Sequence, residues 1–416
     1  MKRTKVLWFT NTSSNYKSAQ NIYNGGGWIS ALENEMKKIS NLDIGISFFS
    51  QGEPFKSIQE SVSYYPISLD RSFKNRIKRF GSDKKQEKAQ INALLKVITD
   101  FEPNIIHVFG SEQIFGLLSL HTKIPVIIHL QGLITPYLNA YFPPSYSFLD
   151  MALQKGYSLS KVYRNIIDYR GFIKGAKREK IIFNNCKLFM GRTIFDKQIA
   201  SIYSPNSEYF YCSEMLRSVF YTTDVWKFDT LSNKIKIIST ISSPLYKGAD
   251  LILKTANILK KELKLDFEWL VFGVSEFKIA ERITKINASE VSVQPMGIIS
   301  AIDLSAELKS CNCYFHSSYI DNSPNSICEA QILGVPVIAT NVGGVSSLIE
   351  HLNTGILIPA NDPYSGASHI KEIFNNKVMA SYIGSNARVL ALERHDKRNI
   401  VNDLTTVYRN IKKDIN

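Results

Sequence analysis

The sequence lacks any run of apolar residues long enough to cross a bilayer. A membrane-spanning helix needs about 20 such residues, and the best stretch, residues 124–134, is interrupted by His129 and Gln131. The apolar run near the amino terminus, residues 6–9, is too short for the core of a secretory signal peptide. We therefore expect a cytoplasmic protein that neither spans a membrane nor is exported.

Cysteine is also scarce, with five residues in a chain of 416. An odd number placed among apolar neighbours predicts reduced, buried thiols and not a disulfide framework. Cys311 and Cys313 form the closest pair, but no second pair of cysteines or histidines follows at the spacing of a zinc site. The sequence therefore predicts no metal site.

The length exceeds the roughly 250–300 residues at which one hydrophobic core stops growing, so at least two domains are expected. Hydrophobic residues make up 44% and charged residues 21%. This composition excludes a collagen-like or largely disordered chain.

Positive charge is concentrated in the first half of the chain. The net charge is +13, of which residues 1–225 carry 29 − 18 = +11 and the rest carries 21 − 19 = +2. Such asymmetry indicates an anionic partner, either a membrane surface, a phosphorylated acceptor or nucleic acid, with plain solubility as the alternative. No helix-turn-helix, ribonucleoprotein or zinc-finger signature is present, so nucleic acid is not expected.

Short β-branched runs alternate with helical patterns along the chain. The runs lie at residues 6–9, 44–49, 105–108, 126–128 and 188–190, then at 235–238, 269–272, 291–293, 314–315, 337–339 and 356–358. This rhythm predicts two α/β domains with parallel sheets. We place them at residues 1–225 and 226–393, with an irregular connection within 203–232 and a separate helix in 394–416.

Parallel sheets bind ligands beyond the carboxyl ends of their strands, so the loops there are candidate sites. Gly26 and Gly27 belong to a glycine run between the first strand and a helix, where free amides suit an anion and a flexible turn is the alternative. Lys247 and Gly248 open a helix after residues 235–241. A lysine in the first turn of a helix is unfavourable beside the positive end of the helix dipole, and a bound anion such as diphosphate would explain its placement. A solvated surface lysine is the alternative.

The segment 317–330 is the richest in polar groups. Ser323 and Pro324 predict the N-cap and the first residue of a helix. Asp321 lies in the preceding loop and Glu329 lies eight positions later, so the two carboxylates address different parts of one ligand.

Carboxylates suit sugar hydroxyls, whereas the amides of residues 325–328 suit phosphate. Helix capping and ordinary surface charge are the alternative interpretation of this segment.

Together these elements resemble the retaining glycosyltransferases of GT-B fold known as group one or family four. The strongest part spans residues 311–359, with a two-acid region, then Gly-Val-Pro-Val-Ile-Ala, Gly-Gly and Thr-Gly-Ile-Leu-Ile-Pro in order. The resemblance covers nearly the whole chain. It implies two Rossmann-like domains that face a central cleft, the first for the acceptor and the second for a nucleotide sugar, with residues 394–416 crossing back to the first.

The resemblance also implies roles for residues of the second domain. Glu329 would hold the ribose hydroxyls, and Asp321, where the family has glutamate, would contact the transferred sugar. Lys247 would neutralise the leaving diphosphate, although the arginine that usually precedes it is absent from residues 241–245. The other candidate donor-binding residues are Asn325, Ser326, Ile327, Gly26, Gly27, Gly297 and Ser242. Ser242 or Ser243, or an arginine from elsewhere in the chain, would take the place of the missing arginine.

In the first domain, His129 resembles the family histidine near the reacting sugar, whereas His107 is interpreted as structural. Residues 191–196, Gly-Arg-Thr-Ile-Phe-Asp, resemble an element of bacterial polysaccharide-type members. By that resemblance Arg192 reaches an acceptor or a phosphate.

The implied reaction is transfer of a sugar, with retention, from a nucleotide diphosphate sugar to a glycan or polyprenyl-linked glycan in cell-surface polysaccharide biosynthesis. Lys247, Asp321 and His129 are the candidate catalytic residues. No Asp-x-Asp sequence occurs, which agrees with a metal-independent site that uses no cofactor. A non-catalytic subunit that binds a nucleotide sugar is the alternative.

Residues 71–80 place Phe73, Ile77 and Phe80 at helical spacing among basic residues, and a second basic, aromatic stretch covers residues 157–187. The first pattern is typical of helices that lie in a membrane interface. Basic clusters are attracted to anionic lipid, which predicts peripheral contact with the inner face of the cytoplasmic membrane. A solvated basic helix is the alternative.

Overall fold

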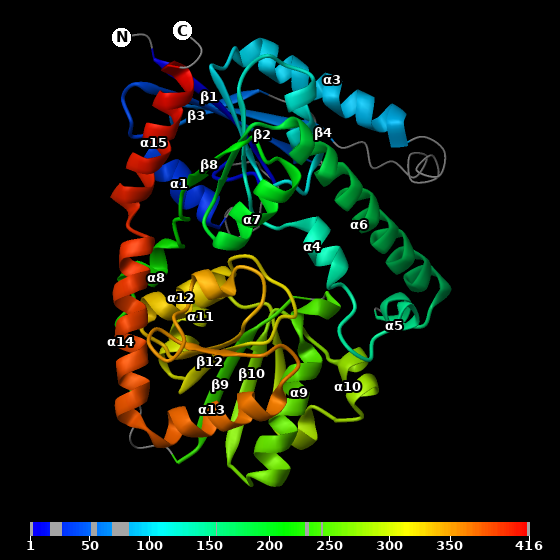
Figure 1. Ribbon diagram of the computed structural model, residues 1–416, viewed down its shortest axis with the longest axis vertical. Coiled ribbons are helices and arrows are strands. Elements are labelled where there is room, and N and C mark those ends of the chain that lie inside the picture. The colour runs from blue at the N-terminus through cyan, green and yellow to red at the C-terminus, as the bar shows by residue number, and fades with distance from the viewer. Residues whose placement is uncertain are drawn as a thin grey trace.

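The computed structural model describes residues 3–16, 27–50, 56–68, 83–154, 156–228, 233–242 and 244–413. These residues form two α/β domains arranged along the longest axis of the molecule, each built on a mostly parallel sheet (Figure 1). The predicted pair of Rossmann-like domains is confirmed.

Within the described residues, the first sheet has the strand order β3-β4-β2-β1-β5-β6-β7-β8. All neighbours pair in parallel except β3 and β4, which form an antiparallel edge. The bounds are β1 (Thr4–Thr10), β2 (Leu42–Ser50), β3 (Ser57–Gln59), β4 (Val62–Ser68), β5 (Ile105–Phe109), β6 (Val126–His129), β7 (Leu188–Gly191) and β8 (Glu208–Tyr211).

The second sheet is parallel throughout, with the order β11-β10-β9-β12-β13-β14 over the described residues. The bounds are β9 (Ile235–Thr240), β10 (Phe267–Phe272), β11 (Val293–Gly297), β12 (Cys313–His316), β13 (Val337–Thr340) and β14 (Ile356–Ile358).

Helices cover both sheets. Those of the first domain are α1 (Trp28–Met36), α3 (Asp83–Phe101), α4 (Ile134–Asn139), α5 (Phe148–Leu153), α6 (Leu159–Asn185) and α7 (Ile194–Tyr203). Those that follow in the chain are α8 (Ser218–Thr222), α9 (Ala249–Asn257), α10 (Lys278–Thr284), α11 (Ala301–Lys309), α12 (Asn325–Leu333), α13 (Pro363–Asn375), α14 (Lys377–Arg394) and α15 (Lys397–Lys413).

Strand β1 shows how the first sheet is buried on both faces. Successive side chains of a strand point to opposite faces. Val6 and Trp8 therefore join a core with α1 and α15, whereas Leu7 and Phe9 join a core with α3 and α6. Burial on both faces explains why the strand is a continuous apolar run in the sequence.

The first crossing between the domains lies at residues 212–217. Strand β8 is still an edge of the first sheet, and Leu216 and Phe220 already belong to the core of the second domain. The crossing therefore precedes the expected boundary at residue 225. The stretch 203–232, expected to be irregular, contains β8 and α8, which are too short to show a period in the sequence.

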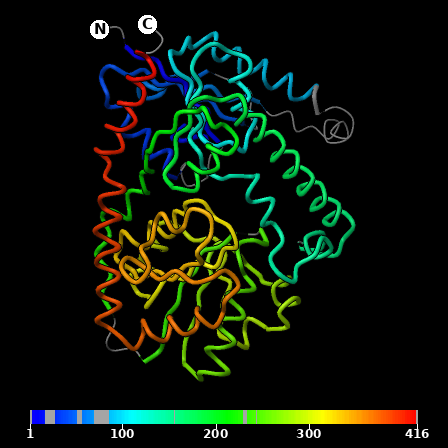
Figure 2. Tube along the Cα trace, viewed as in Figure 1, coloured from blue at the N-terminus to red at the C-terminus, as the bar shows by residue number. Residues whose placement is uncertain are grey.

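The second crossing leads into α15, which lies against the first domain although it follows the second in the chain (Figures 1 and 2). Tyr408 lies inside the first domain, where Trp8 Nε1 donates to its hydroxyl at 3.0 Å and His107 Nδ1 lies 2.5 Å from it. The buried face consists of Ile400, Leu404, Val407, Tyr408 and Ile411.

The structure also bears on the expectations about membrane spans and cysteines. In the part of the chain that the structure describes, no helix is both long and apolar enough to span a bilayer. All five cysteines are buried and free, as expected. The pattern at residues 71–80 and the residues Gly26 and Ser243 lie outside the described residues.

Candidate active site

The turn after β9 and the loop after β12 meet at the carboxyl edge of the second sheet. Lys247 ends a short 3₁₀ turn, and Asp321 lies in the loop that leads to α12. Lys247 Nζ is 2.6 Å from Asp321 Oδ2, and the two side chains are 20% and 8% exposed. Two residues nominated for catalysis therefore form one largely buried ion pair.

Gly248 explains how the turn and the loop come so close. Its φ is +76°, and a Cβ at this position would lie 1.9 Å from the carbonyl oxygen of Ser317. The Ser317 hydroxyl in turn donates to the Lys247 carbonyl at 2.8 Å. Since glycine alone tolerates this backbone approach, Gly248 fixes Lys247 just ahead of α9.

Asp321 is a carboxylate in spite of its burial. Burial raises its pKa, but attraction to Lys247 and to the neighbouring His316 outweighs this and holds the pKa of Asp321 below its ordinary value. Ser318 Oγ donates to Oδ2 at 3.3 Å, and Tyr137 of the first domain donates to Oδ1 at 3.3 Å. The site therefore keeps a negative charge beside a cation at neutral pH.

Helix α12 begins one residue later than the sequence suggested. Pro324, and not Ser323, is the N-cap, with an extended ψ of 118°. Its carbonyl accepts from the Ile327 N–H at 3.0 Å and from the next N–H at 3.4 Å, so these two amides are used within the helix. The amides of Asn325 and Ser326 have no acceptor among the described residues, which leaves them for an anion.

Glu329 lies in the second turn of α12 and is 4% exposed. Arg217 reaches it from the crossing between the domains, and its Nε and Nη2 donate to the two carboxylate oxygens, both at 2.8 Å. Burial raises the pKa of Glu329, and Arg217 opposes that shift. The carboxylate expected to hold ribose is thus paired with an arginine that no local pattern indicated.

A cavity of about 590 Å³ lies beside this edge of the sheet. Residues after β9, β10 and β11 line it, together with α10 and with Tyr146 from the first domain. Ser242 and Gly297 are both in its wall. Gly297 has a φ of +73° with no atom within 4 Å of an added Cβ, so this part of the wall is bare backbone.

His129 ends β6 and is fully buried. Its ring lies 5.4 Å from that of His107 and 5.5 Å from that of Trp28, which follows Gly27, the N-cap of α1. Burial and the neighbouring His107 and Arg192 hold the pKa of His129 well below its ordinary value. Neither ring nitrogen has a hydrogen-bond partner among the described residues, whereas His107 contacts Tyr408.

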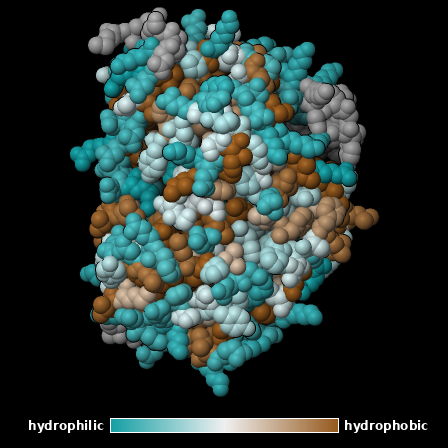
Figure 3. All heavy atoms as spheres, in the orientation of Figure 1, coloured by the Kyte–Doolittle hydropathy of each residue, from teal (hydrophilic) through white to brown (hydrophobic). Residues whose placement is uncertain are grey.

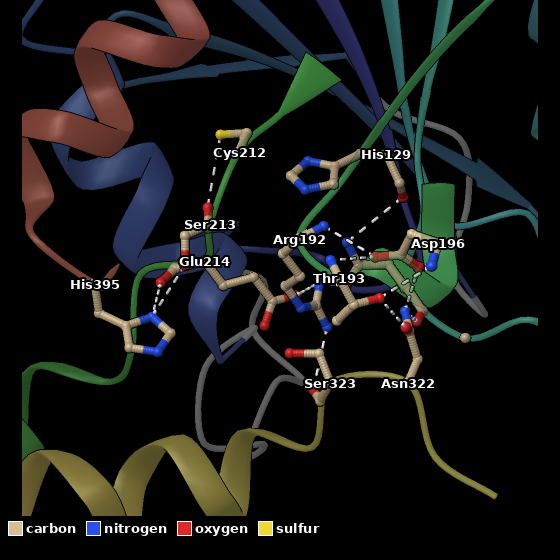
Figure 4. A network of polar contacts seen from close by, with 12 residues as sticks. His129, Arg192, Thr193, Asp196, Cys212, Ser213, Glu214, Asn322, Ser323 and His395 are labelled. Carbon is tan, nitrogen blue, oxygen red and sulfur yellow. Dashed lines mark hydrogen bonds and ion pairs between the residues drawn. The ribbon is translucent and has the colours of Figure 1, made fainter. Parts of the chain in front are cut away.

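Arg192 follows β7 and has a side chain that is 6% exposed. Its guanidinium forms an ion pair with Glu214 and donates to the Ser323 carbonyl at 3.3 Å (Figure 4). Nη1 also donates to the Gln131 amide oxygen at 3.4 Å. These contacts enclose the guanidinium, so Arg192 links the two domains here and does not present the open face expected for an acceptor or phosphate.

Glu214 is expected to make folding stability depend on pH. Burial raises the pKa of Glu214 to about 7, with Arg192 opposing and Asp196 adding to the shift. An acid whose pKa is higher in the folded state binds its proton more tightly there, so stability rises as pH falls from about 7 toward the ordinary value of 4.5. In scanning calorimetry, the Glu214→Gln variant should exceed the wild type in Tm at pH 8, and the difference should vanish near pH 5. A pH-independent difference would contradict this assignment.

Comparison with known proteins places the site in a family. Residues 222–390 match the family model described as glycosyl transferases group 1. A D-inositol 3-phosphate glycosyltransferase of Paenarthrobacter aurescens is 27% identical over 135 residues, which cover 31% of this chain and 33% of the relative. An N-acetyl-alpha-D-glucosaminyl L-malate synthase of Bacillus anthracis is 30% identical over 88 residues, 21% of this chain and 23% of the relative. The matched segments thus span a third or less of these relatives.

Solved structures resemble the chain over its whole described length. Sucrose-phosphate synthase of Thermosynechococcus elongatus aligns with a TM-score of 0.70 at 15% identity, over 98% of this chain and 99% of that one. Anabaena HepE in complex with UDP and glucose aligns with a TM-score of 0.63 at 15% identity, over 98% and 100%. At such identity the likeness shows the fold. The chain therefore has the GT-B fold, and residues 222–390, which hold Lys247, Asp321 and Glu329, match the group 1 glycosyltransferases.

Proposed function

We propose that the protein is an enzyme that transfers a sugar, with retention, from a nucleotide diphosphate sugar to a hydroxyl acceptor. One observation carries the proposal. The Lys247–Asp321 ion pair, the open amides at the start of α12 and the 590 Å³ cavity all lie at the carboxyl edge of the second sheet. A cation, free amides, a carboxylate and a cavity are the groups that a nucleotide diphosphate sugar requires.

In this proposal, each part of the donor has its own contact. The nucleobase enters the cavity beside Ser242 and Gly297. Glu329 gives up its ion pair with Arg217 and instead accepts hydrogen bonds from the ribose hydroxyls. The diphosphate lies between Lys247 and the amides of α12. Support for such a ligand comes from Anabaena HepE, whose structures hold UDP and UDP-glucose.

The chemistry then depends on stabilising charge. As the bond from sugar to diphosphate breaks, negative charge grows on the leaving oxygen, and preorganised donors stabilise it where water is excluded. Lys247 and the amides of Asn325 and Ser326 supply these donors, and Asp321 orients the sugar. The acceptor hydroxyl attacks from the same face and passes its proton to the departing phosphate, so no metal ion or cofactor is required.

The first experiment is thermal stabilisation of the full chain by nucleotides. UDP, GDP, ADP, CDP and dTDP are compared with matching nucleotide sugars, because a ligand at 100 times its Kd adds about 2.7 kcal/mol of stability. Stabilisation by the nucleotides of one base, together with release of that nucleotide from its sugar, supports the enzyme. Stabilisation without turnover supports a non-catalytic subunit, and no stabilisation contradicts a donor site.

For the acceptor we propose a glycan or a polyprenyl-linked glycan of cell-surface polysaccharide, reached at the inner face of the cytoplasmic membrane. The observation that favours a membrane is the surface of α5 and α6. Figure 3 shows apolar side chains gathered at the right-hand edge, where Figure 1 places α5 and the start of α6. Leu149, Tyr157 and Leu159 are 62%, 74% and 89% exposed.

Basic side chains extend this apolar surface along α6. Positions three, four or seven apart share a helix face, and one such face holds Leu159, Tyr163, Arg170, Lys174, Lys177 and Ile181, all exposed. Within α6, Asp168 is the one exposed acid. Apolar groups at the ends and cations between them complement an anionic bilayer surface.

Charge reversal on this face should weaken binding to anionic vesicles. Each basic residue near an anionic surface contributes about 1 kcal/mol, so Lys174→Glu with Lys177→Glu should lower partitioning onto phosphatidylglycerol vesicles by about 30-fold. Co-sedimentation at low salt measures this. The control reverses two exposed lysines of the second domain, Lys261 and Lys264. Equal loss in both variants, or no binding by the wild type, would contradict the assignment.

A further inference from the structure

Asn322, the residue after Asp321, inserts its side chain into the first domain. Its Nδ2 donates to the Gln131 carbonyl at 2.7 Å and to Asp196 Oδ1 at 2.6 Å. The Thr193 hydroxyl donates to its Oδ1 at 2.8 Å (Figure 4). Asn322 is 1% exposed, and three hydrogen bonds, two of them fully buried, join this side chain of the second domain to three residues of the first.

Two of the three receiving residues, Thr193 and Asp196, are held in place by bonds that do not involve Asn322. Thr193 and Asp196 form a capping box at the start of α7, in which the Thr193 hydroxyl accepts from the Asp196 N–H. Asp196 Oδ2 accepts from the N–H groups of Arg192 and Thr193 at 2.9 and 3.1 Å. These bonds leave Oδ1 for Asn322. The Thr193 and Asp196 part of the socket is therefore held by bonds within the first domain and is complementary to an amide.

The backbone of Asn322 is held from the same side. Its N–H donates to the Tyr137 hydroxyl at 2.9 Å, and that hydroxyl contacts Asp321 Oδ1. A Cβ on Gly344 would lie 2.1 Å from the Asn322 carbonyl oxygen, so the backbone after β13 packs directly against the loop that holds Asn322. Asp321 thus lies between Lys247 of its own domain and the Tyr137 hydroxyl of the other.

We propose that Asn322 is a positioning residue whose insertion into the socket of Gln131, Thr193 and Asp196 couples closure of the two domains to the placement of Asp321 against Lys247. The inference rests on the proposed function in one respect, the part that Asp321 plays in transfer. Opening the cleft withdraws Asn322, and Asp321 then loses its contact with the Tyr137 hydroxyl and is held by its own domain alone. Residues 191–196, Gly-Arg-Thr-Ile-Phe-Asp, accordingly bind a side chain of the second domain.

The coupling is tested first without any assay of activity. In hydrogen exchange of the full chain, Asn322→Ala should speed exchange of the amides of residues 192–196 and 320–323 by about tenfold, and the radius of gyration in small-angle scattering should rise. Thr193→Val should act in the same way, and Thr193→Ser, which keeps the hydroxyl, should restore wild-type exchange. The control is Ser347→Ala, which removes a different bond between the domains, from the Ile194 N–H to Ser347 Oγ.

The second readout separates positioning from a loss of folding. With the nucleotide sugar that stabilises the wild type, Asn322→Ala should lower kcat about 30-fold and change the Kd of the nucleotide less than threefold. Unchanged exchange and scattering in both Asn322→Ala and Thr193→Val would overturn the proposal. Wild-type kcat in an opened Asn322→Ala variant would also overturn it. If no nucleotide binds the wild type, the proposed function fails. The exchange measurement still tests whether Asn322 holds the two domains together.

Discussion

Replacing Lys247 by alanine is expected to lower turnover about 100- to 1000-fold. Lys247 is the cation of the ion pair at the sheet edge, with its Nζ 2.6 Å from Asp321. Removing one preorganised donor from a developing anion typically costs factors of this size. Since no arginine precedes Lys247 in residues 241–245, the chain has no neighbouring cation in that turn to compensate. The measurement is kcat with the nucleotide sugar identified by thermal stabilisation.

Lys254 provides the matched control. It also pairs with a buried aspartate, Asp250, with the two groups 2.8 Å apart, and it lies farther along the helix that Lys247 precedes. Lys254→Ala should keep wild-type kcat. A Lys247→Ala variant that turns over within threefold of the wild type would remove Lys247 from the mechanism. Loss of turnover in both variants would show a general effect of breaking such pairs.

Replacing Glu329 by glutamine should weaken nucleotide binding at least about 30-fold. Hydrogen bonds to a charged group contribute about 1.5–3 kcal/mol, and ribose offers two hydroxyls to this carboxylate. A nucleotide at 100 times the wild-type Kd would then add at most about 0.9 kcal/mol of stability to the variant, compared with about 2.7 kcal/mol for the wild type. Thermal unfolding at fixed nucleotide concentration measures the difference.

Arg217 allows a functional role of Glu329 to be distinguished from a structural one. Arg217→Ala breaks the same bidentate pair but leaves the carboxylate in α12. If Glu329 serves the ribose, Arg217→Ala should retain nucleotide binding and Glu329→Gln should lose it. Identical behaviour of the two variants would mean that the ion pair acts only in folding. Glu350→Gln, at an exposed acid of the same domain, controls for the change of charge.

The strands that the sequence predicts best are those buried on both faces. Their apolar runs are continuous, as in β1 and β13, and the helices between them follow the 3.6-residue period. Strand β8, Glu-Tyr-Phe-Tyr at the sheet edge, has two exposed or half-buried faces and no such run. The start of α12 differed by one residue because Pro324 has the extended ψ of a cap.

In the candidate site, the sequence predicts the central residues but not their partners. Lys247, Asp321 and Glu329 lie in loops and helix ends with recognisable local order, so sequence alone nominates them. Their partners do not follow from any local pattern, since Arg217 is 112 positions from Glu329 and Tyr137 is 184 positions from Asp321. The Tyr137–Asp321 pair forms only when the two domains come together, whereas the Arg217–Glu329 pair depends on how the start of α8 packs beside α12. No periodicity of the sequence encodes either placement.

The position of α15 has a consequence for the order of folding during synthesis. The first domain is made first, but Trp8 and His107 lie against Tyr408, which the ribosome adds about 300 residues after His107. Domains generally fold as units while the chain emerges. Here the second domain has all its described strands before the first domain has α15, which covers one of its faces together with α1. Part of one face of the first sheet therefore stays uncovered until α15 has been synthesised.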